Sequence, residues 1–408
     1  EVCAVEADDT DLILDRLTDL IRDNLIQRGE IDGPGASAEA AVRIDLLATI
    51  RAFAWEHLAA SGEQVALQRR HGAYFHDLAL AAHTRLLGPE QVEWLPRLDR
   101  ERHNLRAAMR FLLQSGDLER AIGLNFALWR FWWVRGLQGA ARRAMEEALA
   151  APRPLAPRLR AQALVTLGSM AWSEGDHRTA WRALEEGLTL GDATGEDWGA
   201  AVARMMLGLL AGSEGETARA QGYFNAALRY FRATGGHWGV AFILGYQGLP
   251  ALLRGDLAAA DALFTESLAQ ARASGDLVAT HQALCNLGLL AQARAAHDLA
   301  AGHFAEGLRL AAEIGDVLNA SYLIKGLGGV AQARGRAARA ARLLGAADTL
   351  LRAAGAPWDR YRPERRPDEL LDALRAALGA ADFARHWAQG RALPLEQAID
   401  EALAVAGG

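Results

Sequence analysis

Lysine is almost missing from this chain of 408 residues: of its 44 basic side chains only Lys325 is a lysine, and the others are arginines. A phosphate-binding P-loop needs a lysine directly after a glycine-rich run. Lys325 lies in Ile324-Lys325-Gly326, with no such run before it and no serine or threonine after it. The sequence therefore has no Walker-type nucleotide site, and we expect no cofactor.

Cysteine and long apolar runs are also scarce. The two cysteines, Cys3 and Cys285, are too few and too far apart in sequence for a disulfide framework or a zinc site. No stretch approaches the roughly 20 uninterrupted apolar residues of a membrane helix, and no leader of the secretory type opens the chain. We therefore expect a cytoplasmic protein without a membrane partner.

The motifs of common enzymes are missing as well. The eleven histidines include no H-E-x-x-H motif, and His71 and His76 are one residue too far apart for a helical metal pair. No nucleophile stands at a recognisable spacing from a base. A net charge of −6 provides no field that would attract nucleic acid. We expect a protein that is not an enzyme, with no catalytic residue and no metal.

Four columns of residues do recur, at intervals of 40 residues, over about half of the chain. The columns are Gly168, Gly208, Gly248, Gly288 and Gly328; Ala180, Ala220, Ala260, Ala300 and Ala340; Leu184, Phe224, Phe264, Phe304 and Leu344; and Gly195, Gly235, Gly275, Gly315 and Gly355. A fixed period of this length is the signature of a repeat fold. Such a stack offers one long curved surface rather than a pre-built catalytic pocket.

Each unit is predicted to be a pair of helices. In one unit, residues 197–214 and 217–234 both carry apolar side chains at helical spacing. Gly215-Glu216 separates the two helices, and Gly235-Gly236 ends the second with residues that tolerate a left-handed conformation. Small residues in the first two columns let the helices approach, and the large third column is expected to fill the space between units. The prediction is an all-α, right-handed α-solenoid.

Two positions depart from the pattern. Ala295 stands where Gly175, Gly215, Gly255 and Gly335 mark the turn between the two helices of other units. Pro250 falls inside a predicted helix, where proline removes a hydrogen bond and kinks the chain. Either Pro250 is a tolerated bend in a packed array, or it is a break in the wall of a groove that accommodates a ligand.

The spacing within a unit resembles the tetratricopeptide repeat family across roughly residues 118–355. Leu167-Gly168, Ala180, Leu184 and Gly187 carry the resemblance in one unit. The usual period of that family is about 34 residues, so the 40-residue unit implies longer helices, and the proline that ends the family's unit is missing. This departure favours the long-helix variety of large bacterial regulators over the short peptide clamps.

Residues 1–60 do not follow the period. We expect a helix over residues 11–23, strands over 24–28 and 42–46 with a flexible loop at 29–41 between them, and a helix over 49–58. This order is that of the back half of a winged helix, a small α/β segment. Its main helix carries or adjoins Asp8, Asp9, Asp11, Asp15, Asp19 and Asp23. Such carboxylates would repel phosphate, so we expect no direct binding of nucleic acid.

Several phrases resemble the signal-transduction ATPases with numerous domains (STAND), of the LuxR-like and maltose-activator-like type. They are LDRLTDLIRDNLIQRG, VRIDLLATIRAFAWEHLAASGE, LDRERHNLRAAMRFLLQSGD, LWRFWWVRG and FARHWAQGRALPLEQAIDEAL, in this order. In that family an ATPase module precedes the winged helix and tetratricopeptide repeats follow it. The resemblance implies a winged-helix-like segment at 1–60, a helical junction at 61–117, the repeat superhelix at 118–355 and capping helices at 356–408.

The tetratricopeptide resemblance also implies candidate binding residues, because the first helix of each unit lines the concave face in that family. The candidates are Trp172, Met205, Phe242, Leu249, Gln282, Cys285, Tyr322, Lys325 and Gln332. This lining is mostly apolar, which suits a small effector or an amphipathic partner helix. Alternatively, these side chains face neighbouring helices in a tightly wound superhelix.

The densest aromatic cluster comprises Trp129, Phe131, Trp132 and Trp133. It is either core packing at the start of the solenoid or an aromatic platform for a ligand. Our leading hypothesis is the sensor arm of a STAND-type regulator, which binds an effector or partner protein and passes its state to an upstream ATPase module. The sequence leaves open whether it forms homo-oligomers. The alternatives are a protein-interaction scaffold without a small ligand and an enzyme.

Overall fold

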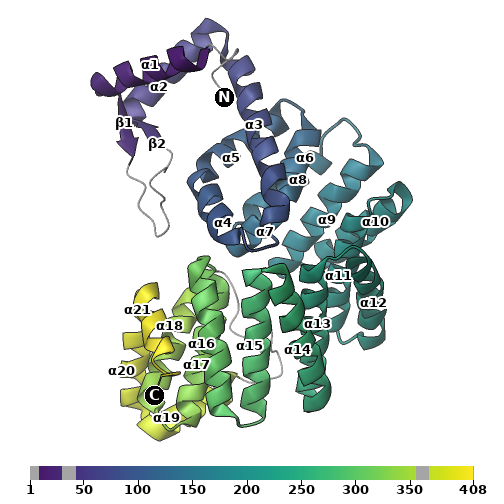
Figure 1. The fold of residues 1–408 in the computed structure, drawn as a ribbon, viewed down its shortest axis with the longest axis vertical. Helices are drawn as coiled ribbons and strands as arrows, with labels where there is room; N and C mark the ends of the chain where they lie inside the picture. The colour runs from purple at the N-terminus through teal and green to yellow at the C-terminus, as the bar shows by residue number, and fades with distance from the viewer. Residues whose placement is uncertain (1–8, 30–42, 355–366, 408) are drawn as a thin grey trace.

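The computed structural model describes residues 9–29, 43–354 and 367–407 (Figure 1). Its N-terminal segment contains α1 (Asp9–Arg22), β1 (Ile26–Gly29), β2 (Arg43–Leu46) and α2 (Ala48–Ser61). The strands pair antiparallel, with Ile26 opposite Leu46. The predicted order of helix, strand, strand and helix is confirmed, but it does not by itself show a winged helix. The predicted loop with Gly33-Pro34-Gly35 lies outside the described residues, as do Cys3 and Asp8.

A helical junction follows the N-terminal segment. Its helices are α3 (Gln64–Arg85), α4 (Gln91–Arg100), α5 (Arg102–Gln114), α6 (Leu118–Ala127), α7 (Trp129–Val134) and α8 (Gln138–Leu149). The aromatic cluster belongs to α7, a short helix that Leu128 separates from α6. Phe131 and Trp132 are buried in the core of this junction. For these two residues, core packing is what the structure shows.

Five helix pairs with the predicted 40-residue period form the array. They are α9 (Pro157–Ser173) with α10 (His177–Thr194), α11 (Asp197–Ser213) with α12 (Thr217–Ala233), α13 (His237–Leu253) with α14 (Leu257–Ser274), α15 (Leu277–Ala293) with α16 (His297–Glu313), and α17 (Val317–Ala333) with α18 (Ala337–Ala353). Successive pairs stack side by side along a curve (Figure 1). This part of the chain is a helical solenoid of repeats; its right-handedness stays a prediction.

Glycine recurs in the first column because a large side chain of the third column fills the space that a Cβ atom would need. A Cβ atom added at Gly208 would lie 2.6 Å from Phe224, and one at Gly288 would lie 2.5 Å from Phe304, which is closer than carbon atoms approach. Each aromatic ring thus packs on the glycine of its own helix pair. The expectation that the large column fills only the space between units is therefore too narrow. Phe304 does both, since a Cβ at Gly326 of the next pair would also lie 2.7 Å from its ring.

Left-handed residues separate the helices. Gly195, Gly235 and Gly315 have φ values of 70°, 69° and 66° in the turns that end the pairs. Ala295 also adopts a positive φ of 54° in the turn within its pair, although its Cβ disfavours that region. The turn at Ala295 is therefore left-handed like the equivalent glycine turns of the other units. Gly355, the last member of its column, lies outside the described residues.

Pro250 does not break the array. Helix α13 runs through it to Leu253, so the proline falls in the last turn of the helix. Proline acts on the turn before it, where its ring and its missing N–H meet the carbonyl group four residues earlier, yet α13 continues for three residues after it. The structure favours the tolerated bend over a break in the groove wall.

The C-terminal helices cover the last pair. They are α19 (Pro367–Leu378), α20 (Ala380–Arg391) and α21 (Leu395–Leu403). Leu374, Phe383 and Ala402 join the core of α17 and α18. Gly390 lets α20 approach the backbone of Arg342 so closely that a Cβ would collide with its carbonyl oxygen. These helices close the apolar end of the array (Figure 1).

The array curves until its later units reach the junction. Gly88 and Pro89, just before α4, lie against Ser274 and Gly275 at the end of α14. Arg135, just after α7, donates from Nη1 to the carbonyl oxygen of Ile314 at 2.7 Å. The superhelix therefore closes on itself, and the first helices of its units face a common interior.

Candidate functional site

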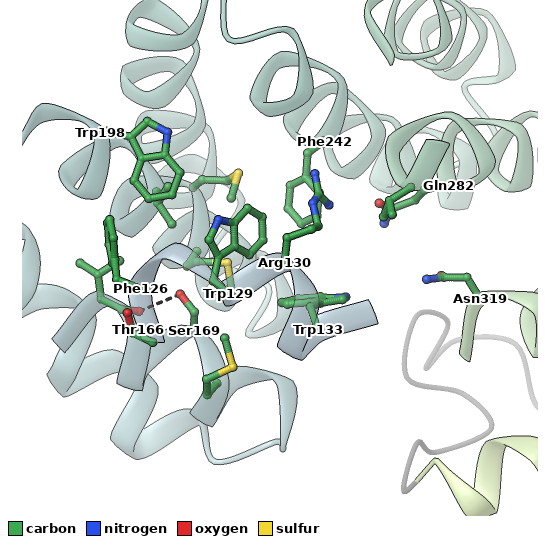
Figure 2. A pocket seen from close by; sticks show the side chains of 16 residues that line it. Phe126, Trp129, Arg130, Trp133, Thr166, Ser169, Trp198, Phe242, Gln282 and Asn319 are labelled. Atoms are coloured by element: carbon green, nitrogen blue, oxygen red, sulfur yellow. Dashed lines mark hydrogen bonds between the residues drawn. The ribbon is translucent and has the colours of Figure 1, made fainter. Parts of the chain in front are cut away.

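The interior of the closed superhelix holds a narrow cavity, which we call the chamber. Residues of α6, α7 and the first helix of each unit line it (Figure 2). They are Phe126, Trp129, Arg130, Trp133, Val165, Thr166, Ser169, Met170, Trp198, Val202, Met205, Met206, Phe242, Val278, Gln282 and Asn319. Its free volume is about 30 Å³, room for one or two water molecules. It is narrow and partly open to solvent.

Aromatic rings form most of one wall. The ring of Trp129 lies 5.3 Å from that of Trp238 and 6.4 Å from that of Trp198, measured between centroids. Trp133 stacks on Trp172 at 5.7 Å. Offset and tilted pairs at such distances are the arrangements that aromatic rings favour. The wall therefore presents flat apolar rings, and the contacts between the rings hold them in place.

Arg130 is the one charged side chain among the described residues of the lining, and it is 4% exposed. Its guanidinium carbon lies 4.8 Å from the ring of Trp129 and 5.5 Å from that of Trp238. Its Nη2 donates to Asp276 Oδ2 at 2.7 Å. Burial lowers the pKa of Arg130, and the charges of Asp276 and Asp316 oppose this shift. The arginine is thus held between two rings with one carboxylate partner.

Asp276 joins the junction to the array. It caps the N-terminus of α15 by accepting from the backbone N–H of Ala279. It also accepts from Arg130 and from Gln91 Nε2 of α4, the latter at 2.8 Å. The other amide atom of Gln91 accepts from the backbone N–H of Leu277 at 2.9 Å. We call Gln91, Arg130 and Asp276 the latch, because these side chains hold the superhelix closed.

A second buried pair lies one unit further on. His281 Nε2 is 3.2 Å from Asp316 Oδ2, and both side chains are 1% exposed. Burial alone would raise the pKa of Asp316, but hydrogen bonds and the charge of His281, with bonds from Asn319, outweigh it and lower that pKa. Asp316 caps α17 as Asp276 caps α15. Asn319, which donates to Asp316, brings this pair to the edge of the chamber.

The polar groups of the chamber gather at two places. Figure 2 shows the side chains of Arg130, Gln282 and Asn319 turned toward one another on one side. Ser169 and Thr166 lie on the other side, and their hydroxyl groups donate to backbone carbonyl oxygens of α9. The first group therefore contains the two side-chain amides of the lining, those of Gln282 and Asn319.

The predicted binding residues separate into two sets. Met205, Phe242 and Gln282, with Trp129 and Trp133 of the aromatic cluster, line the chamber. The others do not line it: Trp132, Trp172, Leu249, Cys285, Tyr322, Lys325 and Gln332. Trp172 supports the wall through Trp133, and Leu249 and Cys285 pack beside apolar cores. The first helices do face the interior, yet most of the distal candidates lie outside the chamber.

Sequence reasoning did not find Phe126, Arg130, Trp198, Val278 or Asn319. The period could have indicated two of them, because Trp198 and Val278 share one 40-residue column. Arg130 gives no such signal, since its partner Asp276 lies 146 residues away.

The chemistry available to the chamber is stacking, apolar contact and hydrogen bonding. Within residues 9–29, 43–354 and 367–407, no group of three or more His, Cys, Asp or Glu side chains is placed to hold a metal ion. In the same ranges no helix combines the length and apolar character that crossing a bilayer requires.

Comparison with known proteins gives likenesses of fold only. No protein-family model matches the chain, and no curated protein matches it. Among solved structures, BtubC (BKLC) from P. vanneervenii is similar with 18% identity and a TM-score of 0.37, over 62% of this chain and 92% of that one. A STAND protein with a tetratricopeptide repeat sensor from Pyrococcus horikoshii has 14% identity and a TM-score of 0.47, over 96% of this chain. This chain covers 60% of that protein's length.

Proposed function

We propose that this protein is a non-enzymatic sensor arm whose repeats bind an effector in the chamber, in a regulator of the STAND type. The observation that carries the proposal is the convergence of side chains from α7, α9, α11, α13, α15 and α17 on one interior. A single small ligand bound there would therefore contact all five repeat pairs.

The latch gives binding a structural consequence. The chamber leaves room for little more than water, so a larger occupant has to widen the superhelix. Widening would strain the contacts of Gln91 and Arg130 with Asp276, which join units far apart in sequence. Occupancy and curvature are therefore coupled, which is what a sensor requires.

The N-terminal segment supplies a surface for the response. Phe53 and Trp55 of α2 are 62% and 50% exposed, and Leu12 and Leu14 of α1 are both 55% exposed. The exposed apolar side chains of these two helices are the surface that, in this proposal, a partner covers. In the proposed regulator, the upstream ATPase module covers them, and the segment acts as the winged helix between ATPase and sensor.

The test is a thermal melt of the protein with a small-molecule fraction from cells that produce it. Binding to the folded state raises the melting temperature. In a Ser169→Leu variant the larger side chain would enter the chamber and abolish the rise; an exposed Thr189→Leu change on α10 is the control. A rise that survives Ser169→Leu, or no rise with any fraction, contradicts chamber binding.

A protein-interaction scaffold is the second candidate. The exposed apolar residues of α1 and α2 favour it, because a protein partner would cover them whether or not the chamber binds anything. A stable complex that forms equally with wild type and Ser169→Leu would support this alternative.

A further inference from the structure

Two hydrogen-bond donors that line the chamber find no acceptor among the described protein residues. The indole Nε1 of Trp129 and the Nε of Arg130 are buried, and within the described residues neither has a hydrogen-bond partner. Both residues line the chamber. A buried donor without an acceptor costs free energy in the folded state. An occupant with an acceptor oxygen would remove that cost.

The charge of the lining argues for a neutral occupant. Arg130 is the one charged side chain among the described residues of the lining, and Asp276 already neutralises it at 2.7 Å. Asp316 adds a further negative charge nearby. An anion would therefore meet no net positive charge, and a cation would meet no carboxylate on the chamber wall.

The shape of the wall argues for a planar occupant. Trp129, Trp133 and Phe242 present rings to the interior, while the amides of Gln282 and Asn319 lie at one end (Figure 2). A flat apolar body can stack between such rings.

We propose that the chamber takes a small, neutral, planar ligand that carries a hydrogen-bond acceptor of the carbonyl type. This inference rests on the proposed function, since it presumes that the chamber binds a ligand. The acceptor oxygen meets Trp129 Nε1–H or Arg130 Nε–H, and the planar body displaces water and separates the aromatic side chains.

The test compares four probes of nearly equal size on the full chain by ligand-observed NMR titration: benzamide, toluene, benzoate and benzylamine. Benzamide is expected to bind at least about threefold more tightly than each of the others, because it alone is a neutral acceptor. Equal or tighter binding of toluene, benzoate or benzylamine overturns the proposal, as does no binding of benzamide.

Two tryptophan variants make the test specific. Trp129→Phe keeps an aromatic ring and removes the N–H, so benzamide affinity should fall about three- to tenfold while toluene affinity stays within about twofold. Trp132→Phe is the matched control, since its Nε1 is also buried without a partner but the residue does not line the chamber. Equal losses in both variants overturn the assignment.

The outcomes separate this inference from the proposed function. If benzamide fails but the cell fraction still raises the melting temperature in a manner that Ser169→Leu abolishes, only the ligand class is wrong. If benzamide binds and no cell fraction acts, the chamber's chemistry stands and its sensor role is wrong.

Discussion

The N-terminal segment and the repeat array use the same apolar residues with opposite results. Phe53 of α2 is 62% exposed, and no residue of α2 is buried. Phe264 of α14 is 0% exposed, because Gly248 of the same pair makes room for its ring. Apolar content therefore does not decide burial here. A matching small residue on a neighbouring helix does.

The two regions also differ in where their apolar side chains find contacts. The array buries its apolar side chains by stacking its units, and Asp276 joins it to the junction. The N-terminal segment leaves Trp55 and Leu47 half exposed and has few contacts beyond α3. One region buries its apolar side chains among the described residues, and the other leaves them exposed.

The strongest test of this contrast removes one ring from each region. Phe264→Ala should destabilise the array by about 3–5 kcal/mol, since it leaves a cavity in a fully packed place. Phe53→Ala should change stability by less than about 0.5 kcal/mol because that ring is mostly in solvent. Urea denaturation followed by circular dichroism measures both. Similar losses would mean that α2 packs as the array does.

A variant of the latch tests whether the junction and the array are held together as one unit. Asp276→Asn keeps the helix cap but leaves the buried Arg130 without a counter-charge, so a loss of about 3 kcal/mol is expected. Asp261→Asn is the control: its pair with Arg294 is 2.9 Å long but well exposed, and should contribute under about 1 kcal/mol. Denaturation gives the energies, and small-angle scattering should show the Asp276 variant expanding. An unchanged radius would show that the latch does not hold the superhelix closed.

Two glycines sharpen the comparison within the array. Gly248→Ala should destabilise by about 1–3 kcal/mol, because the new Cβ would collide with the ring of Phe264. Gly222→Ala, inside α12 with nothing within 4 Å of the added Cβ, should stabilise by about 0.5–1 kcal/mol through helix propensity. Opposite signs in thermal melts are the expected result. Two losses of equal size would refute the close-packing account.

The smallest expected effect concerns Ala295. Its φ of 54° is unfavourable for any residue with a Cβ, so Ala295→Gly should stabilise by about 0.5–1 kcal/mol after the entropy cost of glycine. The reverse change in an equivalent turn, Gly255→Ala at φ 78°, should destabilise by about 1 kcal/mol. The pair is measured by thermal melts, and a gain from Gly255→Ala would be inconsistent with the strain.

The periodic features were predictable, and the contacts that depend on curvature were not. Regular spacing of Gly208 and Phe224 indicates a helix pair because the cause is local and repeats in every unit. The pairing of Arg130 with Asp276 depends on small rotations between units that add up over the array, and sequence spacing does not reveal them. For the same reason Met205 was found as a lining residue, whereas Lys325 was placed in a groove that the chamber does not reach.

Closure also fixes the number of units. Arrays of this kind change length readily when a repeat is duplicated or lost, since each unit needs only its neighbours. Here the partners of the latch lie 146 residues apart, so an added or deleted block of 40 residues would carry Asp276 away from Arg130. Between α7 and α15, the gain or loss of one unit would therefore break the contact between Arg130 and Asp276.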